Sequence, residues 1–211
     1  MTPGFHWTLR PSVKEDDPVL KAFPAELPLL VKQLLLQRGF TGGMETELFL
    51  DPRLSHLSDP FLMGEMRDAV DRIFRAVDEG ETVCIYGDYD VDGVTSVALL
   101  RAILMAYDLD PQYFIPVRSR EGYGLSEAGI KRCLCECADP PSLLITVDCG
   151  TSSVKEVDML NSLGIDVIIL DHHEAGPLGR PDAAAVVNAK IEENSPYTYP
   201  VSYTHLRAHE T

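Results

Sequence analysis

The stretch Gly87-Asp88-Tyr89-Asp90-Val91-Asp92-Gly93 decides the fold and the chemistry that we expect of this chain. The apolar run at 82–86 before it predicts a buried β-strand, and the run after it predicts a helix. Residues two apart in an extended backbone point to the same side, so Asp88, Asp90 and Asp92 would direct three carboxylates into one volume. Such a cluster needs a cation, and oxygen ligands favour Mg²⁺ or Mn²⁺. The alternative is an acidic turn in which one aspartate caps the helix.

Two further strand ends carry the same kind of side chain. The apolar run at 143–147 is followed by Asp148, and the run at 167–170 is followed by Asp171-His172-His173. Sites in open α/β sheets form where the carboxyl ends of the strands meet. The three ends together therefore predict a metal centre. Taken singly, Asp148 would also serve as a helix cap and the two histidines as loop residues.

Helical and strand patterns alternate along most of the chain. Helices are predicted at 66–77, 94–104, 126–137 and 154–163, and strands at 82–86, 113–117, 143–147, 167–170 and 185–187. This order predicts an α/β fold with a mostly parallel sheet flanked by helices. Ahead of it we expect an arm at 1–24 and an N-terminal helical extension. Its helix at 27–35 has a leucine stripe that we expect in the core.

The composition narrows the classes of function and location. The net charge of −15 argues against broad electrostatic binding of nucleic acid, although bound cations would offset part of it. No apolar run has membrane-spanning length and no signal segment opens the chain, so no membrane partner is predicted. The five cysteines, an odd number, predict free thiols in a reducing compartment and hence a cytoplasmic location.

Three of these cysteines alternate along a predicted helix. Cys133 and Cys137 share a helix face and Cys135 points away from it. A zinc site needs four convergent ligands, so we favour reduced cysteines over a zinc site.

The motifs resemble those of the DHH phosphoesterase superfamily. Residues 86–96 resemble its first motif, Val147-Asp148-Cys149-Gly150 its second, and Asp171-His172-His173 is the triplet that names it. Further matches at 38–40, 49–52, 59–60, 121–125 and 186–188 are similar to the bacterial single-stranded-DNA-specific exonucleases of this superfamily. The resemblance extends over residues 29–200.

The resemblance implies a two-metal phosphodiesterase. It would be a 5′-to-3′ exonuclease on single-stranded DNA, acting in repair and recombination with two Mn²⁺ or Mg²⁺ ions. Asp148 would bridge the two ions, with Asp90 on one and Asp92 on the other. Many relatives have a histidine where this chain has Tyr86, and we expect Asp88 to supply the missing ligand.

The resemblance also assigns the histidine triplet. His172 would bind metal through a neutral imidazole nitrogen, and Asp171 is the candidate acceptor that fixes its tautomer. His173 would face the phosphate. With Asp171, it completes the catalytic pair that we predict.

A glycine-containing loop is the predicted substrate contact. Arg118 and Arg120 lie near a strand end, beside Gly122 and Gly124. Guanidinium groups bind phosphate oxygens in pairs, and glycines let backbone approach a ligand. We expect this loop to contact the DNA backbone; the alternative is a solvated, flexible loop.

Two other functions stay open. A DHH enzyme on small substrates would take pyrophosphate, oligoribonucleotides or cyclic dinucleotides. The loop at 121–125 favours the exonuclease, and Tyr86 weighs against a pyrophosphatase. A degenerate domain would act as a scaffold, but the carboxylates and histidines of the motifs are intact. No repair-protein partner can be named.

The resemblance also predicts the domain organisation. The superfamily has a fourth aspartate motif and a substrate-gripping domain downstream of the triplet. We therefore predict an N-terminal arm and helical extension at 1–60, and a DHH catalytic domain at 61–200 that is incomplete at its C-terminal end. Residues 201–211 continue neither structural period, and we predict a non-native tail there.

We expect the purified 211-residue chain to bind Mn²⁺ weakly and to hydrolyse little single-stranded DNA. The reason is that the fourth motif and the substrate domain of the family would lie beyond its last residue. Nucleotide release in the presence of Mn²⁺ measures this, and robust turnover would contradict it.

Overall fold

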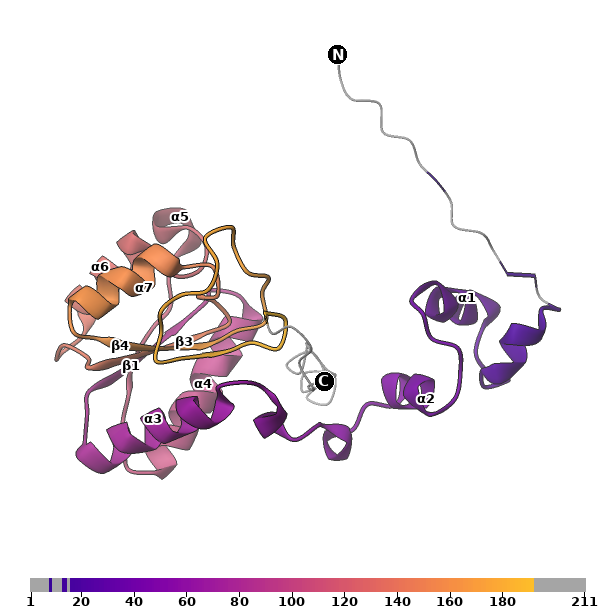
Figure 1. The fold of residues 1–211 in the computed structure, drawn as a ribbon, viewed down its shortest axis with the longest axis horizontal. Coiled ribbons are helices and arrows are strands. Elements are labelled where there is room, and N and C mark those ends of the chain that lie inside the picture. The colour runs from indigo at the N-terminus through magenta and orange to yellow at the C-terminus, as the bar shows by residue number, and fades with distance from the viewer. Residues whose placement is uncertain (1–7, 9–12, 15, 192–211) are drawn as a thin grey trace, which may run out of the picture. The chain divides into compact units, whose positions relative to one another are not determined.

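The computed structural model describes residues 8, 13–14 and 16–191, which fall into two compact units divided between Leu57 and Ser58 (Figure 1). The predicted tail at 201–211, the end of the predicted catalytic domain and most of residues 1–12 lie outside the described residues. The predicted domain limits at 60 and 200 therefore stay a prediction. Within the described part of the chain, no helix is both long enough and apolar enough to cross a membrane.

The N-terminal unit is built from short helices. These are η1 (Pro18–Ala22), α1 (Leu29–Gln37), α2 (Met44–Leu50) and η2 (Leu54–His56). The expectation of an irregular arm up to residue 24 was wrong at η1, because Asp17 caps this turn and Leu20 is buried. The leucine stripe of α1 is only partly in the core, since Leu35 is buried and Leu30 is 66% exposed.

The second unit is a three-layer α/β structure, as predicted. Its elements are η3 (Pro60–Leu62), α3 (Met66–Glu79), β1 (Val83–Gly87), α4 (Val91–Ala106), β2 (Gln112–Phe114), α5 (Arg118–Glu121), α6 (Glu127–Glu136), β3 (Leu143–Val147), α7 (Val154–Ser162), β4 (Asp166–Leu170) and β5 (Ala185–Val187). The five strands are parallel and lie in the order β2-β1-β3-β4-β5. Figure 1 shows α3 and α4 on one face of the sheet and α6 and α7 on the other.

Both faces of the sheet are buried, which explains the continuous apolar runs of its strands. Val83 and Ile85 of β1 pack on the side of α3 and α4. Cys84 and Tyr86 pack on the opposite side, against residues of α6 and α7. The strands thus pack against helices on both faces of the sheet, and this packing fixes the positions of their carboxyl ends.

The strand register brings the predicted motifs together. Gly87 pairs with Val147, Val147 with Leu170, and Leu170 with Val187. The residues that follow these four strand ends are Asp88, Asp148, Asp171 and Asn188. The chain leaves β1 toward β2 on one side, whereas β3 lies on the other, so a topological switch point falls between β1 and β3. This is where ligand sites form in open α/β sheets.

The structure corrects the geometry predicted for the three alternating aspartates. The backbone is not extended through all three, because α4 begins at Val91 rather than at residue 94. Asp90 caps this helix: its Oδ1 accepts from the amides of Asp92 and Gly93, at 2.8 and 3.1 Å. Asp92 therefore stands in the first helical turn. Asp90 therefore both caps the helix and lies at the predicted site. The cap uses only its Oδ1.

The edge strand also differs from the prediction. β2 ends at Phe114 instead of residue 117, and Arg118–Glu121 forms the short helix α5. The cause is local: the carboxylate of Glu121 accepts from the amide of Val117 at 2.6 Å, which closes a helical turn.

We expect Gly93→Ala to lower the free energy of unfolding by about 1–3 kcal/mol, the usual cost of overpacking. A Cβ at this position would lie 2.3 Å from the carbonyl oxygen of Asp88, so the first turn of α4 would have to move away from the strand end. Urea denaturation measures the change. The exposed Thr95→Ala in the same helix serves as the control and should stay near the native value. Equal stability of both variants would contradict the close approach.

Candidate metal centre

Four buried polar side chains follow the four in-register strand ends. Asp88, Asp148, Asp171 and Asn188 are 0, 2, 6 and 1% exposed. Burying a carboxylate is costly unless hydrogen bonds or a cation compensate its charge. The partners of each group therefore indicate what the site is built to hold.

The first group is a cluster of carboxylates. Asp88, Asp90 and Asp148 each place an oxygen within 4.8 Å of the others. Oδ2 of Asp88 and Oδ1 of Asp148 are buried without a hydrogen bond of normal geometry from the described residues. The set offers several oxygen ligands close together, which fits a hard divalent cation.

Two carboxylates of the cluster have raised pKa values. Burial, followed by the charges of Asp90 and Asp92, raises the pKa of Asp148 to about 7. Burial also raises the pKa of Asp88, against the opposing effect of the Tyr89 amide. A cation among these oxygens would favour their ionised forms and reverse both shifts.

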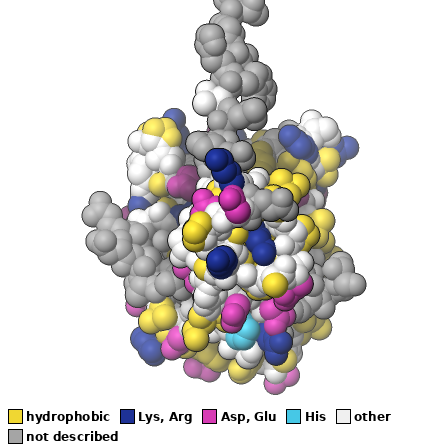
Figure 2. Space-filling view, turned by 90° about the vertical axis from the view of Figure 1, so that its right-hand side faces the viewer, with side chains coloured by type: hydrophobic (Ala, Val, Ile, Leu, Met, Phe, Trp, Pro, Cys, Tyr) yellow, Lys and Arg dark blue, Asp and Glu magenta, His cyan; other side chains and the backbone are white. Residues whose placement is uncertain are grey.

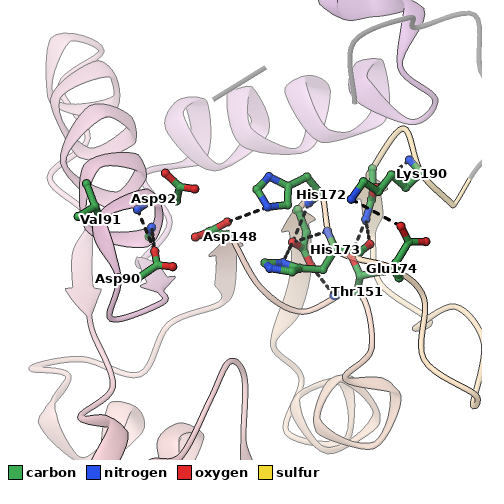
Figure 3. A network of polar contacts seen from close by, with 12 residues as sticks. Asp90, Val91, Asp92, Asp148, Thr151, His172, His173, Glu174 and Lys190 are labelled. Carbon is green, nitrogen blue, oxygen red and sulfur yellow. Dashed lines mark hydrogen bonds and ion pairs between the residues drawn. The ribbon is translucent and has the colours of Figure 1, made fainter. Parts of the chain in front are cut away.

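The backbone of Asp148 is unusual. Its φ of 62° lies in the left-handed region, which aspartate and asparagine tolerate better than most residues. Its amide donates to the carbonyl of Leu170 at 2.9 Å. The turn is thus held by β4, and the carboxylate is directed into the site (Figure 3). Such strained residues cluster at functional sites.

The second group joins Asp148 to the two histidines. One atom from each of Asp148, His172 and His173 lies within 4.8 Å of the others. Nε2 of His172 is 3.7 Å from Oδ1 of Asp148. Burial, followed by the charge of His173, lowers the pKa of His172, so its ring is neutral at pH 7, the form that binds metals. Asp148 therefore belongs to both groups, and Figure 3 places it between Asp90 and His172.

Asp92 lies at the edge of this arrangement. It stands on the first turn of α4, and Figure 3 shows its carboxylate near that of Asp148. Its charge acts on both Asp148 and His172. The structure thus brings all five predicted metal ligands to one region. Asp148 is the residue that both clusters share.

Asp171 holds the histidine loop and fixes one ring. Its Oδ1 accepts from the amides of His172 and His173 at 2.7 and 3.1 Å, and lies 2.7 Å from Nδ1 of His173. Burial raises the pKa of Asp171, but hydrogen bonds from Thr151 and His173 outweigh it and keep the pKa below its usual value. The ionised carboxylate holds the proton of His173 on Nδ1. We predicted this role toward His172, and the ring contact of Asp171 described here is with His173.

Three residues extend this network and were not predicted as site residues. The hydroxyl of Tyr123 lies 2.8 Å from Nε2 of His173. Burial, with the charges of the nearby aspartates, raises the pKa of Tyr123 to about 12, so the hydroxyl stays protonated and is able to donate to Nε2. Asn188 donates to Oγ1 of Thr151 and to the carbonyl of His173, both at 2.8 Å. The signal for Asn188 was its place after the strand at 185–187.

Tyr86 lies away from the ligands, although many relatives have a histidine at this position. Its side chain is fully buried in the core on the side of α6 and α7. Its hydroxyl donates to the carbonyl of Gly124 at 3.2 Å. Tyr86 thereby anchors the loop that carries Tyr123. Asp88 takes part in the carboxylate cluster, and its role as the ligand that replaces the histidine stays a prediction.

The predicted substrate residues lie in different environments. Arg118 lies over the ring of Tyr89, with 5.3 Å from Cζ to the ring centre, and Tyr89 is next to Asp88. Gly122 ends α5 with a φ of 83°. Gly124 is the loop residue held by Tyr86. Arg120 is exposed on α5, with Glu121 as a neighbouring charge.

The surface charge fits the sequence analysis. On the face in Figure 2, Lys and Arg side chains are interspersed with Asp and Glu and do not form one broad basic region. Contact of an anionic polymer with this face would therefore depend on a few positioned groups rather than on a general field.

Comparisons with known proteins agree with the fold and the motifs. Residues 82–209 match the DHH family, N-terminal domain. The chain is 40% identical over 179 residues to the single-stranded-DNA-specific exonuclease RecJ of Bacillus subtilis, covering 84% of this chain and 22% of that protein. It is 34% identical over 173 residues to RecJ of Escherichia coli, covering 81% and 28%. The chain thus spans about a quarter of the length of these curated relatives.

Two solved structures are similar in fold. One is exonuclease RecJ bound to manganese, with a TM-score of 0.56 and 32% identity, covering 70% of this chain and 38% of that one. The other is RecJ from Thermus thermophilus in complex with Mn²⁺, with a TM-score of 0.56 and 28% identity, covering 88% and 26%.

Metal-free Asp148→Asn should be more stable than the native chain above pH 7, by on the order of 4 kcal/mol. Because the pKa of Asp148 is about 7 in the folded chain and 3.8 for an ordinary aspartate, the native chain loses stability from this group as the pH rises through that window. Asparagine removes the charge and tolerates the left-handed backbone.

Urea denaturation with a chelator, repeated from pH 4 to pH 8, measures the difference. We expect it to vanish near pH 4. The exposed Asp139→Asn is the control and should follow the native curve. A difference that does not depend on pH would rule out the raised pKa as its cause.

Proposed function

The chain belongs to the DHH family, and on that premise we propose that it is part of a metal-dependent phosphodiesterase that removes nucleotides from single-stranded DNA. The observation that carries the proposal is the position of Asp148. It belongs both to the cluster of carboxylates and to the cluster with the two histidines. A shared carboxylate is what a two-metal phosphodiesterase requires. The names of the relatives supply the substrate class. The 5′-to-3′ direction is what the motif resemblance implies.

The donor set fits Mn²⁺ or Mg²⁺. Asp88, Asp90, Asp92, Asp148 and His172 would hold the ions, since carboxylate oxygens dominate the set and the one imidazole is neutral. When bound, such ions supply the activation of water and the neutralisation of charge on the phosphate. The two similar structures that hold manganese support this choice.

His173 is the residue that we propose to face the phosphate. Asp171 keeps the proton on Nδ1, so Nε2 is directed toward Tyr123 and the open side of the loop. Tyr123 is 58% exposed, and its hydroxyl and Nε2 form a polar pair that a phosphate oxygen could join. Thr151 and Asn188 hold the loop from behind, which limits movement of the ring.

Arg118, Tyr89 and Tyr123 make a surface suited to a nucleotide. The rings of Tyr89 and Tyr123 meet edge to face with centres 6.3 Å apart, and the guanidinium of Arg118 lies over Tyr89. Single-stranded nucleic acid is bound by aromatic faces for the bases and by cationic groups for the backbone. The set would therefore position a strand beside the carboxylates despite the net charge of −15.

The small-substrate alternative is not favoured. Tyr86 lies in the core rather than among the ligands, and the relatives reported above are named for single-stranded DNA. The described cysteines are free thiols, which accords with the predicted cytoplasmic location; that location stays a prediction.

In a longer form that carries the length found in the relatives, we expect Mn²⁺-dependent release of nucleotides from single-stranded DNA and little hydrolysis of pyrophosphate. Asp148→Asn should lower this activity at least about 100-fold, because loss of an outer-shell partner alone costs up to that much. Asp139→Asn should leave it unchanged. Faster hydrolysis of pyrophosphate than of DNA would instead support the small-substrate alternative.

Arg118→Ala in the same longer form should weaken binding of single-stranded DNA about tenfold, since a charged hydrogen bond contributes about 1.5 kcal/mol or more. Filter binding or anisotropy without hydrolysis measures the affinity. Arg101→Ala is the charge-matched control, because Arg101 pairs with Asp110 on another part of the unit. Equal affinity of the two variants would remove Arg118 from the substrate contact.

A further inference from the structure

A second cluster of metal-ligand side chains lies in the core between β1 and α6. The sulfur atoms of Cys84, Cys133 and Cys137 all lie within 4.8 Å of one another. Those of Cys84 and Cys133 are 3.6 Å apart, which is a hydrogen-bond distance for sulfur and too long for a disulfide. Cys84 and Cys133 are buried, and Cys137 is partly exposed. The proposed phosphodiester chemistry uses none of the three.

The cluster arises from two elements that are distant in sequence. Cys133 and Cys137 stand one helical turn apart, and the amide of Cys137 donates to the carbonyl of Cys133 at 3.0 Å, which ends α6. Cys84 comes from β1, on the face of the sheet that α6 covers. The helical pair predicted from sequence thus gains a third sulfur from the sheet.

We propose that Cys84, Cys133 and Cys137 form a binding site for one thiophilic divalent ion of the Zn²⁺ and Cd²⁺ class, with one coordination position open to solvent. Sulfur ligands select such ions and disfavour Mg²⁺ and Mn²⁺. Three protein ligands with a fourth position left open is a known zinc arrangement. The partly exposed Cys137 provides the entry path that such a site needs.

Charge and protons balance in this reaction. One divalent ion displaces three thiol protons and leaves a site with one net negative charge. Burial raises the pKa of Cys137 to about 11, so this group carries its proton before the ion binds. The hydrogen bond with Cys84 lowers the pKa of Cys133, against burial, and the charges of Glu136 and Arg132 on α6 oppose each other there.

An ion at this site would tie the end of α6 to the middle of β1. The start of α6 is capped by Ser126, whose hydroxyl accepts from the amide of Gly129 and donates to the carbonyl of Glu121. Occupancy would therefore stabilise the fold, because the ion binds the folded chain and not the separated thiols. The effect would not depend on hydrolysis of any substrate.

Cd²⁺ titration of the reduced 211-residue chain tests the proposal. Excess Mg²⁺ is added so that the carboxylates do not bind Cd²⁺. The ultraviolet charge-transfer absorption of thiolate-bound Cd²⁺ then reports binding to sulfur ligands only. We expect one equivalent to bind with this absorption and to raise the melting temperature. Cys137→Ser should weaken binding by roughly 10–100-fold or more. Cys135→Ser, an exposed position of the same helix, should bind as the native chain does.

Two results would overturn the proposal. One is equal Cd²⁺ affinity in the Cys137→Ser and Cys135→Ser variants, or binding without thiolate absorption. The other is a thiol titration of the purified chain that finds fewer than its five cysteines reduced, with a disulfide between Cys84 and Cys133. Because Cys137 is partly exposed, its serine variant should fold, and its melting curve without metal checks this.

Discussion

The in-register pairing of four parallel strands is the constraint on which the site depends. Gly87, Val147, Leu170 and Val187 end at the same height, so the polar residue after each is forced next to its neighbours. The apolar strands are buried on both faces, and this burial fixes the register. Carboxylates that would repel one another are held together because the sheet behind them leaves no other position. The fold thus supplies the charge density that a cation then compensates.

The two kinds of strand-end group are compensated in different ways. Asp171 is surrounded by donors from Thr151 and His173, and its pKa is held low without a metal. Asp148 has other carboxylates beside it, and its pKa is raised to about 7. Asp171 therefore positions the histidine loop. The ionised form of Asp148, in contrast, would be stabilised by a cation. The pKa values of these two residues, which follow adjacent strands, are shifted in opposite directions. This difference agrees with a structural role for Asp171 and a ligand role for Asp148.

The sequence predicted the sheet and the side chains that meet at its edge, because both follow from short-range patterns. Apolar runs followed by Asp148 or by Asp171 needed only the rule that strand ends meet. It failed where a local hydrogen bond decides the geometry: Asp90 caps α4, so Asp92 lies on a helix. It also failed where side-chain packing decides the partner. Asp171 bonds the ring of His173 within the same loop, and Cys84 approaches Cys133, 49 residues away; no periodicity reveals either contact.

The anomalous scattering of Mn²⁺ in crystals of this chain tests the central claim most directly. The account predicts two manganese positions, about 3.5–4 Å apart, that share the carboxylate of Asp148. Asp88 or Asp90 should complete one position and His172 the other. Two ions that do not share Asp148, or manganese bound only at exposed surface carboxylates, would contradict it.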